Sequence, residues 1–133
     1  MIQTHIGGAD IRALAREFGT PTYVYDRAVI EQRVADLKGF PVIRFAQKAC
    51  SNIAILALMR KLGVVVDAVS AGEINRALLA GYKPGQIVYT ADIFDRPALE
   101  AVVKHGVPVN CGSLDMLEQF GARCPGREVT LRI

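Results

Sequence analysis

Residues 42–48 read VIRFAQK, and residues 63–70 read GVVVDAVS. Each is a short apolar run that ends in polar residues, and a helical pattern follows each of them. Similar runs begin near Val42, Val64, Ile87, Val107 and Val129, 20 to 23 residues apart. Because a helical segment separates each run from the next, the sequence predicts an α/β fold with parallel strands.

The helical segments are predicted over residues 53–62, 73–80, 97–105 and 114–120. A glycine follows each of the first three, as expected where a helix ends in a left-handed residue. Upstream, Asp10 and Asp26 are expected to cap two further helices, and residues 22–25 to form a short strand. Continuous apolar strands are typical of a parallel sheet that helices cover on both faces.

Two architectures fit this pattern. The 133 residues suffice for one domain, and no composition shift marks a second. A complete (β/α)8 barrel needs about 250 residues, so the chain would be the N-terminal portion of a TIM-like barrel, truncated after about five regular strands. A complete doubly wound sheet of the flavodoxin type is the alternative. Length favours the doubly wound sheet, whereas a last run (residues 129–133) that stops in mid-strand favours the barrel.

Composition excludes several classes of function. The net charge of +3 comes from scattered basic residues, which does not indicate a nucleic-acid binder. No apolar run approaches the ~20 residues of a membrane span, and the start lacks the pattern of a secretory signal. The three cysteines lack metal-type spacing, which favours the cytoplasm and predicts no metal site.

Lys48 ends the first apolar run, at the strand end where α/β enzymes keep their reactive groups. Strand alternation would place Arg44, Ala46 and Lys48 on one face, so that the small Ala46 leaves space beside Lys48 for something flat and bulky. A lysine amine near apolar surface can act as a nucleophile towards an aldehyde, because desolvation disfavours its charged form. The alternative is a structural lysine whose amine extends to solvent at the rim of the sheet.

Asp67 lies among valines in the second run. An unpaired carboxylate there would cost several kcal/mol, so a partner is expected, either Lys48 or Arg132. This pair could serve a site or only the fold. Downstream, Ser70 and Glu73 have the spacing of a capping box, although a site role for Glu73 stays open.

Three segments read together resemble a known family: residues 44–52 (RFAQKACSN), residues 67–73 (DAVSAGE) and residues 131–133 (LRI). They resemble the alanine-racemase-like (fold type III) pyridoxal-phosphate-dependent decarboxylases, and within them the diaminopimelate decarboxylase branch. The resemblance runs from about residue 18 to the end of the chain. Cys50 stands where many relatives have Asn, and the lysine that many carry within residues 90–94 is absent, which indicates a particular branch.

The resemblance implies that Lys48 is catalytic and forms the internal aldimine with pyridoxal 5'-phosphate. It implies that Asp67 and Arg132 stand near Lys48 and the cofactor ring. Ala46, whose small side chain leaves space beside Lys48, is expected to border the cofactor as well. The implied reaction converts meso-2,6-diaminopimelate to L-lysine and CO2, the last step of lysine biosynthesis. Alternatives are a decarboxylase or racemase of another amino acid, a non-catalytic pyridoxal-phosphate-binding protein, or a complete five-stranded binding module.

The resemblance also implies that residues 1–133 form only part of a pyridoxal-phosphate-binding barrel domain. The remaining barrel, with the phosphate grip, and a C-terminal β-domain would lie outside them. The full-length protein would be a cytoplasmic homodimer acting on a small amino acid, and the 133-residue chain alone is expected to be inactive.

Overall fold

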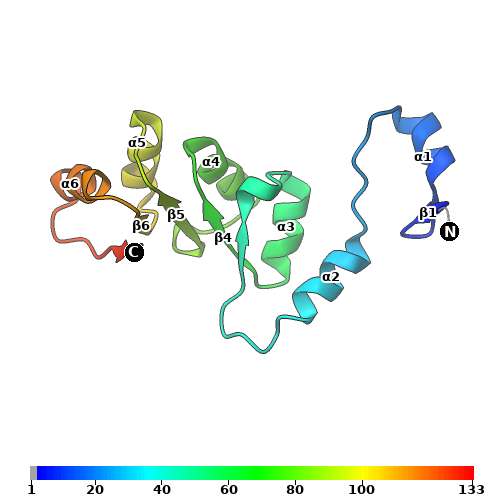
Figure 1. Ribbon diagram of the computed structural model, residues 1–133, viewed down its shortest axis with the longest axis horizontal. Coiled ribbons are helices and arrows are strands. Elements are labelled where there is room, and N and C mark those ends of the chain that lie inside the picture. Colours follow the sequence, from blue (N-terminus) through cyan, green and yellow to red (C-terminus); the bar gives the residue numbers. More distant parts are fainter. Residues whose placement is uncertain (1–2) are drawn as a thin grey trace. The chain divides into compact units, whose positions relative to one another are not determined.

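The computed structural model describes residues 3–133 (Figure 1). The chain divides into two compact units, one that ends at Pro41 and one from Val42 to Ile133. Each unit is described by itself below. No change in amino-acid composition along the sequence marks the boundary between the two units.

The first unit contains a two-stranded antiparallel sheet and two helices. The elements are β1 (His5–Ile6), β2 (Ala9–Asp10), α1 (Ile11–Phe18) and α2 (Arg27–Ala35). The predicted caps are confirmed: the Asp10 carboxylate accepts a hydrogen bond from Ala13 N (2.8 Å), and that of Asp26 accepts one from Ala28 N (2.8 Å).

The predicted strand over residues 22–25 is wrong. This segment is exposed and has no strand pairing, and the side chain of Tyr23 is 91 % exposed. Aromatic and β-branched residues favour a strand only where a neighbouring strand can pair with them, and among residues 3–133 no strand pairs with this segment.

The second unit contains a five-stranded parallel sheet with β3 (Arg44–Ala46), β4 (Val65–Ala68), β5 (Ile87–Ala91), β6 (Val109–Cys111) and β7 (Thr130–Leu131). Each strand pairs with the next one in sequence, in the order β3-β4-β5-β6-β7. A doubly wound sheet reverses its strand order at a switch point, and this sheet does not. The order therefore excludes the flavodoxin type and fits the wall of a barrel.

Four α-helices connect these strands: α3 (Ile53–Lys61), α4 (Ala71–Leu79), α5 (Arg96–His105) and α6 (Leu114–Arg123). Two 3₁₀ turns accompany them, η1 (Gln47–Ala49) and η2 (Pro84–Gln86). Figure 1 shows α4, α5 and α6 along one side of β4, β5 and β6. The predicted glycines past the helix ends are confirmed, since Gly63, Gly81 and Gly106 have φ of 80°, 88° and 69°.

The prediction that helices cover both faces of the sheet is wrong for residues 42–133. Along β4, Val66 and Ala68 are fully buried, whereas Val65 and Asp67 between them are only half-buried. Right-handed crossovers between strands in sequential order place every helix on the same face. The opposite face therefore has no helical cover within this unit.

The core fills the space between the covered face and the helices. It includes Ile74 and Ala77 of α4, Val102 of α5 and Phe120 of α6. Tyr89 of β5 stacks on Phe94 with ring centroids 5.0 Å apart. This packing fixes the carboxyl ends of the strands, where the site residues lie.

Candidate functional site

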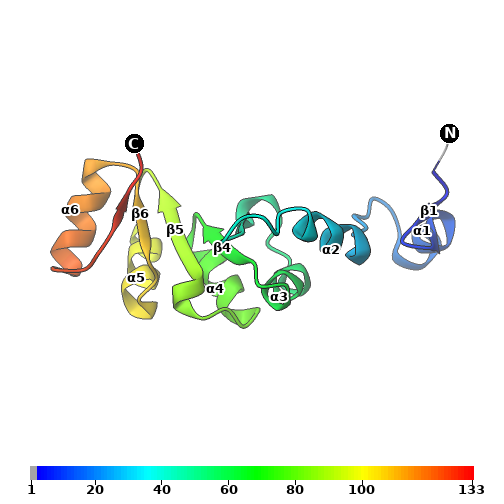
Figure 2. The ribbon, with the colours of Figure 1, turned by 90° about the horizontal axis from the view of Figure 1, so that it is seen from below.

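The carboxyl ends of the five parallel strands lie at one edge of the sheet, as β4, β5 and β6 show side by side in Figure 2. Lys48 follows β3 at this edge and is exposed. The strand ends at Ala46, and Lys48 is the middle residue of η1. The prediction that strand alternation extends from Ala46 to Lys48 is therefore wrong, because the chain tightens into a 3₁₀ turn in which side chains no longer alternate between two faces.

Asp67 of β4 lies opposite Ala46 in the sheet register, on the face without helices. Its Oδ1 atom is buried and has no hydrogen-bond partner among residues 3–133. The expected ion pair with Lys48 or Arg132 is not formed there. Lys48 has left the strand, and β7, which precedes Arg132, lies three strands from β4, about 14 Å at the usual strand spacing.

Arg132 instead reaches Asp92, which follows β5. Its Nη1 lies 3.5 Å from Asp92 Oδ1. Gly112, which follows β6, lies against the same carboxylate: a Cβ there would collide with Asp92 Oδ1 and with the Ala91 carbonyl oxygen. The missing side chain of Gly112 thus leaves room for Asp92 to reach past β6 to Arg132.

The uncovered face also carries Thr90 and Asn110, which are register partners on β5 and β6. The Asn110 side-chain amide donates to Thr90 Oγ1 (3.3 Å). Sequence reasoning did not single out Thr90, Asn110 or Asp92, which the structure places on the uncovered face or at the strand ends. Their positions near strand ends, by the argument applied to Lys48, are the signal that could have found them.

Glu73 acts in a helix cap. Ser70 Oγ accepts a hydrogen bond from Glu73 N (3.2 Å), and Glu73 Oε2 accepts one from Val69 N (2.9 Å). The predicted capping arrangement is confirmed, with the reciprocal bond falling on Val69 rather than on Ser70. It fixes the turn between β4 and α4, just past Asp67.

Three further groups are poor acid–base or nucleophilic candidates at neutral pH. Burial raises the pKa of Tyr82 to about 12, against a small opposing effect of Arg60. Burial, with the charges of Asp95 and Glu73, raises the pKa of Tyr89 to about 12. Burial also raises the pKa of the Cys111 thiol, which disfavours the reactive thiolate.

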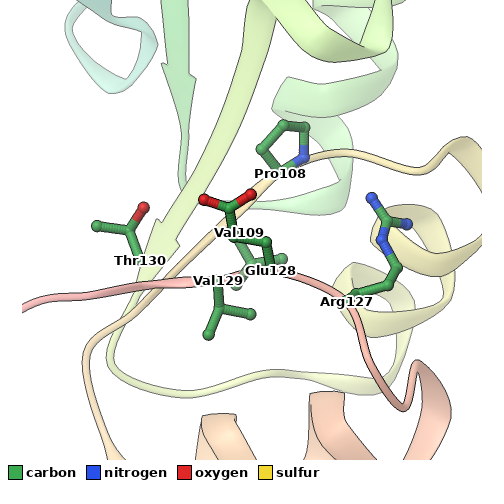
Figure 3. A pocket seen from close by; sticks show the side chains of 6 residues that line it. All are labelled: Pro108, Val109, Arg127, Glu128, Val129 and Thr130. Carbon is green, nitrogen blue, oxygen red and sulfur yellow. The ribbon is translucent and has the colours of Figure 1, made fainter.

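A pocket of about 340 Å³ lies at the opposite edge of the sheet (Figure 3). It is lined by the first residues of β6 and β7 and by the segments before them: Pro108, Val109, Arg127, Glu128, Val129 and Thr130. Because reactive groups of parallel sheets gather at the carboxyl ends of strands, this pocket is not part of the candidate site.

Residues 3–133 hold no group of three or more His, Cys, Asp or Glu side chains placed to bind a metal. Within the same residues, every helix is too short or too polar to span a bilayer.

The residues at the β3–β4 end fit a flat aldehyde cofactor such as pyridoxal phosphate. Lys48 is exposed, and Ala46 carries only a methyl group, which leaves space at the end of β3. The unpaired Oδ1 of Asp67 can accept a hydrogen bond from a protonated nitrogen.

Comparison with known proteins shows the family to which the chain belongs. The sequence model of the pyridoxal-binding domain of pyridoxal-dependent decarboxylases matches residues 27–133. The diaminopimelate decarboxylase of Escherichia coli (strain K12) is 52 % identical over 134 residues, which cover 98 % of this chain and 32 % of that protein. The chain therefore spans about a third of the length of the curated relatives it matches.

Solved structures show the same likeness. A crystal structure of diaminopimelate decarboxylase matches with a TM-score of 0.84 at 56 % identity, over 87 % of this chain and 28 % of that one. The lysine decarboxylase from Selenomonas ruminantium matches with a TM-score of 0.80 at 26 % identity, over 93 % and 34 %. The chain is thus a homologue of the N-terminal portion of diaminopimelate decarboxylase, and it belongs to the pyridoxal-dependent decarboxylases through their pyridoxal-binding domain.

Proposed function

We propose that this chain carries the pyridoxal-phosphate-binding lysine of an enzyme that decarboxylates meso-2,6-diaminopimelate to L-lysine. The observation that carries the proposal is the exposed Lys48 amine at the end of β3, beside the strand whose Asp67 has a buried, unpaired oxygen. This pair lies in a pyridoxal-binding domain, and the similar curated proteins are diaminopimelate decarboxylases.

The residues have distinct roles in this proposal. Lys48 Nζ would hold the cofactor aldehyde, and the register partners Ala46 and Asp67 would border the cofactor on the uncovered face. The Asp67 carboxylate stabilises a positive charge placed next to Oδ1. Arg132, held near Asp92, adds a cation at the same edge of the sheet. The chemistry that bound pyridoxal phosphate would supply is an acceptor for the electron pair left on the substrate Cα when CO2 departs.

The lysine assignment is tested by borohydride reduction in the presence of pyridoxal phosphate, followed by peptide mapping. Protein expressed from the complete reading frame should carry the pyridoxyl label on Lys48. A label on Lys61 or Lys83 instead would refute the assignment.

The substrate assignment is tested by CO2 release from meso-diaminopimelate, L-lysine, L-ornithine and L-arginine. A site that hydrogen-bonds the distal amino acid group of diaminopimelate rejects analogues without it, because its buried polar groups would be left unpaired. We expect a clear preference for meso-diaminopimelate. Equal or faster turnover of ornithine would move the protein to another branch of the family.

A decarboxylase of another amino acid is the second candidate, favoured by the likeness to the lysine decarboxylase. Preferred turnover of L-lysine would support it. Label on Lys48 without CO2 release would indicate an amino acid racemase or a non-catalytic pyridoxal-phosphate-binding protein, and chiral analysis of the amino acid would separate these two.

We further propose that residues 1–133 form part of a barrel domain in a cytoplasmic homodimer. Light scattering on protein expressed from the complete reading frame tests the oligomeric state.

A further inference from the structure

Gln47 has the one fully buried polar side chain among residues 3–133, with 0 % exposure. Its Nε2 donates to the backbone oxygen of Glu73 (2.8 Å), and its Oε1 is buried without a hydrogen-bond partner. A buried amide with an unpaired oxygen is unfavourable, and an apolar side chain of similar volume would avoid that cost. The hydrogen bond from Nε2 serves the fold, whereas the unpaired Oε1 is a cost that the fold alone does not explain.

The backbone of Gln47 closes the turn that carries Lys48. Its carbonyl oxygen accepts hydrogen bonds from Cys50 N (3.0 Å) and from Ser51 Oγ (3.2 Å). Lys48, the next residue, is exposed, so the two side chains have opposite environments in one short turn. Gln47 thus fixes the turn from the buried side while Lys48 stays accessible.

The hydrogen bond from Gln47 reaches the first turn of α4. There the Glu73 carboxylate accepts from Val69 N (2.9 Å), and Val69 follows the β4 strand that carries Asp67. Gln47 therefore joins the turn after β3 to the turn after β4, the two segments that carry Lys48 and Asp67.

We propose that Gln47 is a positioning residue for Lys48: it anchors the Lys48 turn on α4 and so orients the lysine amine towards pyridoxal phosphate. The inference rests on the proposed function, because it takes Lys48 as the cofactor lysine. Loss of the anchor should slow the capture of cofactor, since small displacements of a reacting group lower rates strongly.

The test compares Gln47→Met with unsubstituted protein from the complete reading frame, and Gln119→Met, on the exposed side of α6, is the matched control. Pyridoxal phosphate is added to each. Absorbance of the lysine–cofactor adduct and the borohydride-trapped label on Lys48 give the rate of capture. Thermal unfolding is measured without cofactor.

We expect Gln47→Met to lower the rate of Lys48 labelling about tenfold or more, within the range known for misplaced groups. Its unfolding midpoint without cofactor should change little, because the loss of the hydrogen bond to the Glu73 backbone oxygen opposes the gain from removing the unpaired Oε1. Gln119→Met should match the unsubstituted protein in both measurements. If Gln47→Met fails to fold, Ser51→Ala removes the hydrogen bond to the Gln47 carbonyl and should slow labelling in the same direction.

The outcomes separate the two proposals. Unsubstituted protein without label on Lys48 would refute the proposed function. Label on Lys48 at the same rate and with the same absorbance band in Gln47→Met would overturn only the positioning role. A lowered unfolding midpoint with normal labelling would show that Gln47 serves the fold alone.

Discussion

Replacing Asp67 by Asn separates a binding role of this carboxylate from a structural one. The amide keeps the volume and removes the charge. Removing one partner of a buried ion pair usually costs about 3–5 kcal/mol. Asp67 forms no such pair among residues 3–133, and its Oδ1 is buried without a partner. We therefore expect the free energy of unfolding without cofactor to change by less than about 1 kcal/mol, or to rise, because an unpaired amide is less costly to bury than an unpaired charge.

Cofactor binding should respond differently. If Asp67 Oδ1 accepts a hydrogen bond from a charged group once pyridoxal phosphate is present, that bond contributes about 1.5–3 kcal/mol. Since about 1.4 kcal/mol corresponds to a factor of ten, Asp67→Asn should weaken cofactor binding about 10- to 150-fold. A fall in affinity without a fall in stability is the signature of a binding residue.

The assay is equilibrium titration with pyridoxal phosphate, followed by adduct absorbance, beside urea unfolding of the protein without cofactor. Asp115→Asn is the matched control, because this exposed residue in the first turn of α6 removes the same charge away from the site. It should leave the cofactor affinity unchanged. A stability loss of 3 kcal/mol or more in Asp67→Asn with normal affinity would refute the reasoning and make Asp67 a structural residue.

The remaining predictions concern Gly112, two tyrosines and the isolated chain. Gly112→Ala should destabilise by about 1–3 kcal/mol in urea unfolding, because its Cβ would collide with Asp92, whereas Gly85→Ala, with open space around it, should change little. The pKa of Tyr82 and of Tyr89 is about 12 in the folded protein, against an ordinary value of 10. The contribution of their burial to the free energy of unfolding is therefore complete below pH 10 and falls as the pH rises towards 12. The fall should be smaller in Tyr82→Phe than in the unsubstituted protein, and equal falls would contradict this. The 133-residue polypeptide by itself should self-associate, as measured by light scattering, because one face of its sheet and its edge strands β3 and β7 lack cover. It should also release no CO2. A monomer that releases CO2 would contradict this prediction.

Much of the fold was predictable because its signals are local. The periodic spacing of apolar residues and the capping residues placed α3 and α5 within one residue of their observed ends. Glycines marked where three helices end. The sheet order was not predictable from these signals, since pairing depends on contacts between distant segments. For the same reason, the sequence could not decide whether helices cover one face or two. The strand expected over residues 22–25 failed because propensity has no effect without a neighbouring strand.

The candidate site was predictable in position and not in its contacts. The C-terminal end of a strand can be located along the sequence alone, so Lys48 and Asp67 could be singled out without the structure. Pairing of side chains is three-dimensional, and the expected partner Arg132 contacts Asp92 instead. The close approach of Gly112 to Asp92 left no sequence signal, because its backbone has no left-handed conformation that requires glycine.

The two buried side-chain atoms without partners among residues 3–133, Asp67 Oδ1 and Gln47 Oε1, lie at the ends of the neighbouring strands β4 and β3. Unpaired buried polar atoms are rare in folded proteins. One lies on the residue before Lys48 and the other on the neighbouring strand, which indicates a constraint other than stability. A double-mutant cycle with Asp67→Asn and Gln47→Met tests whether that constraint is shared. If both act on the Lys48 amine, their effects on cofactor affinity should be non-additive by about 0.5 kcal/mol or more, whereas their effects on stability without cofactor should add. Additive effects on affinity would mean that the two residues serve the site independently.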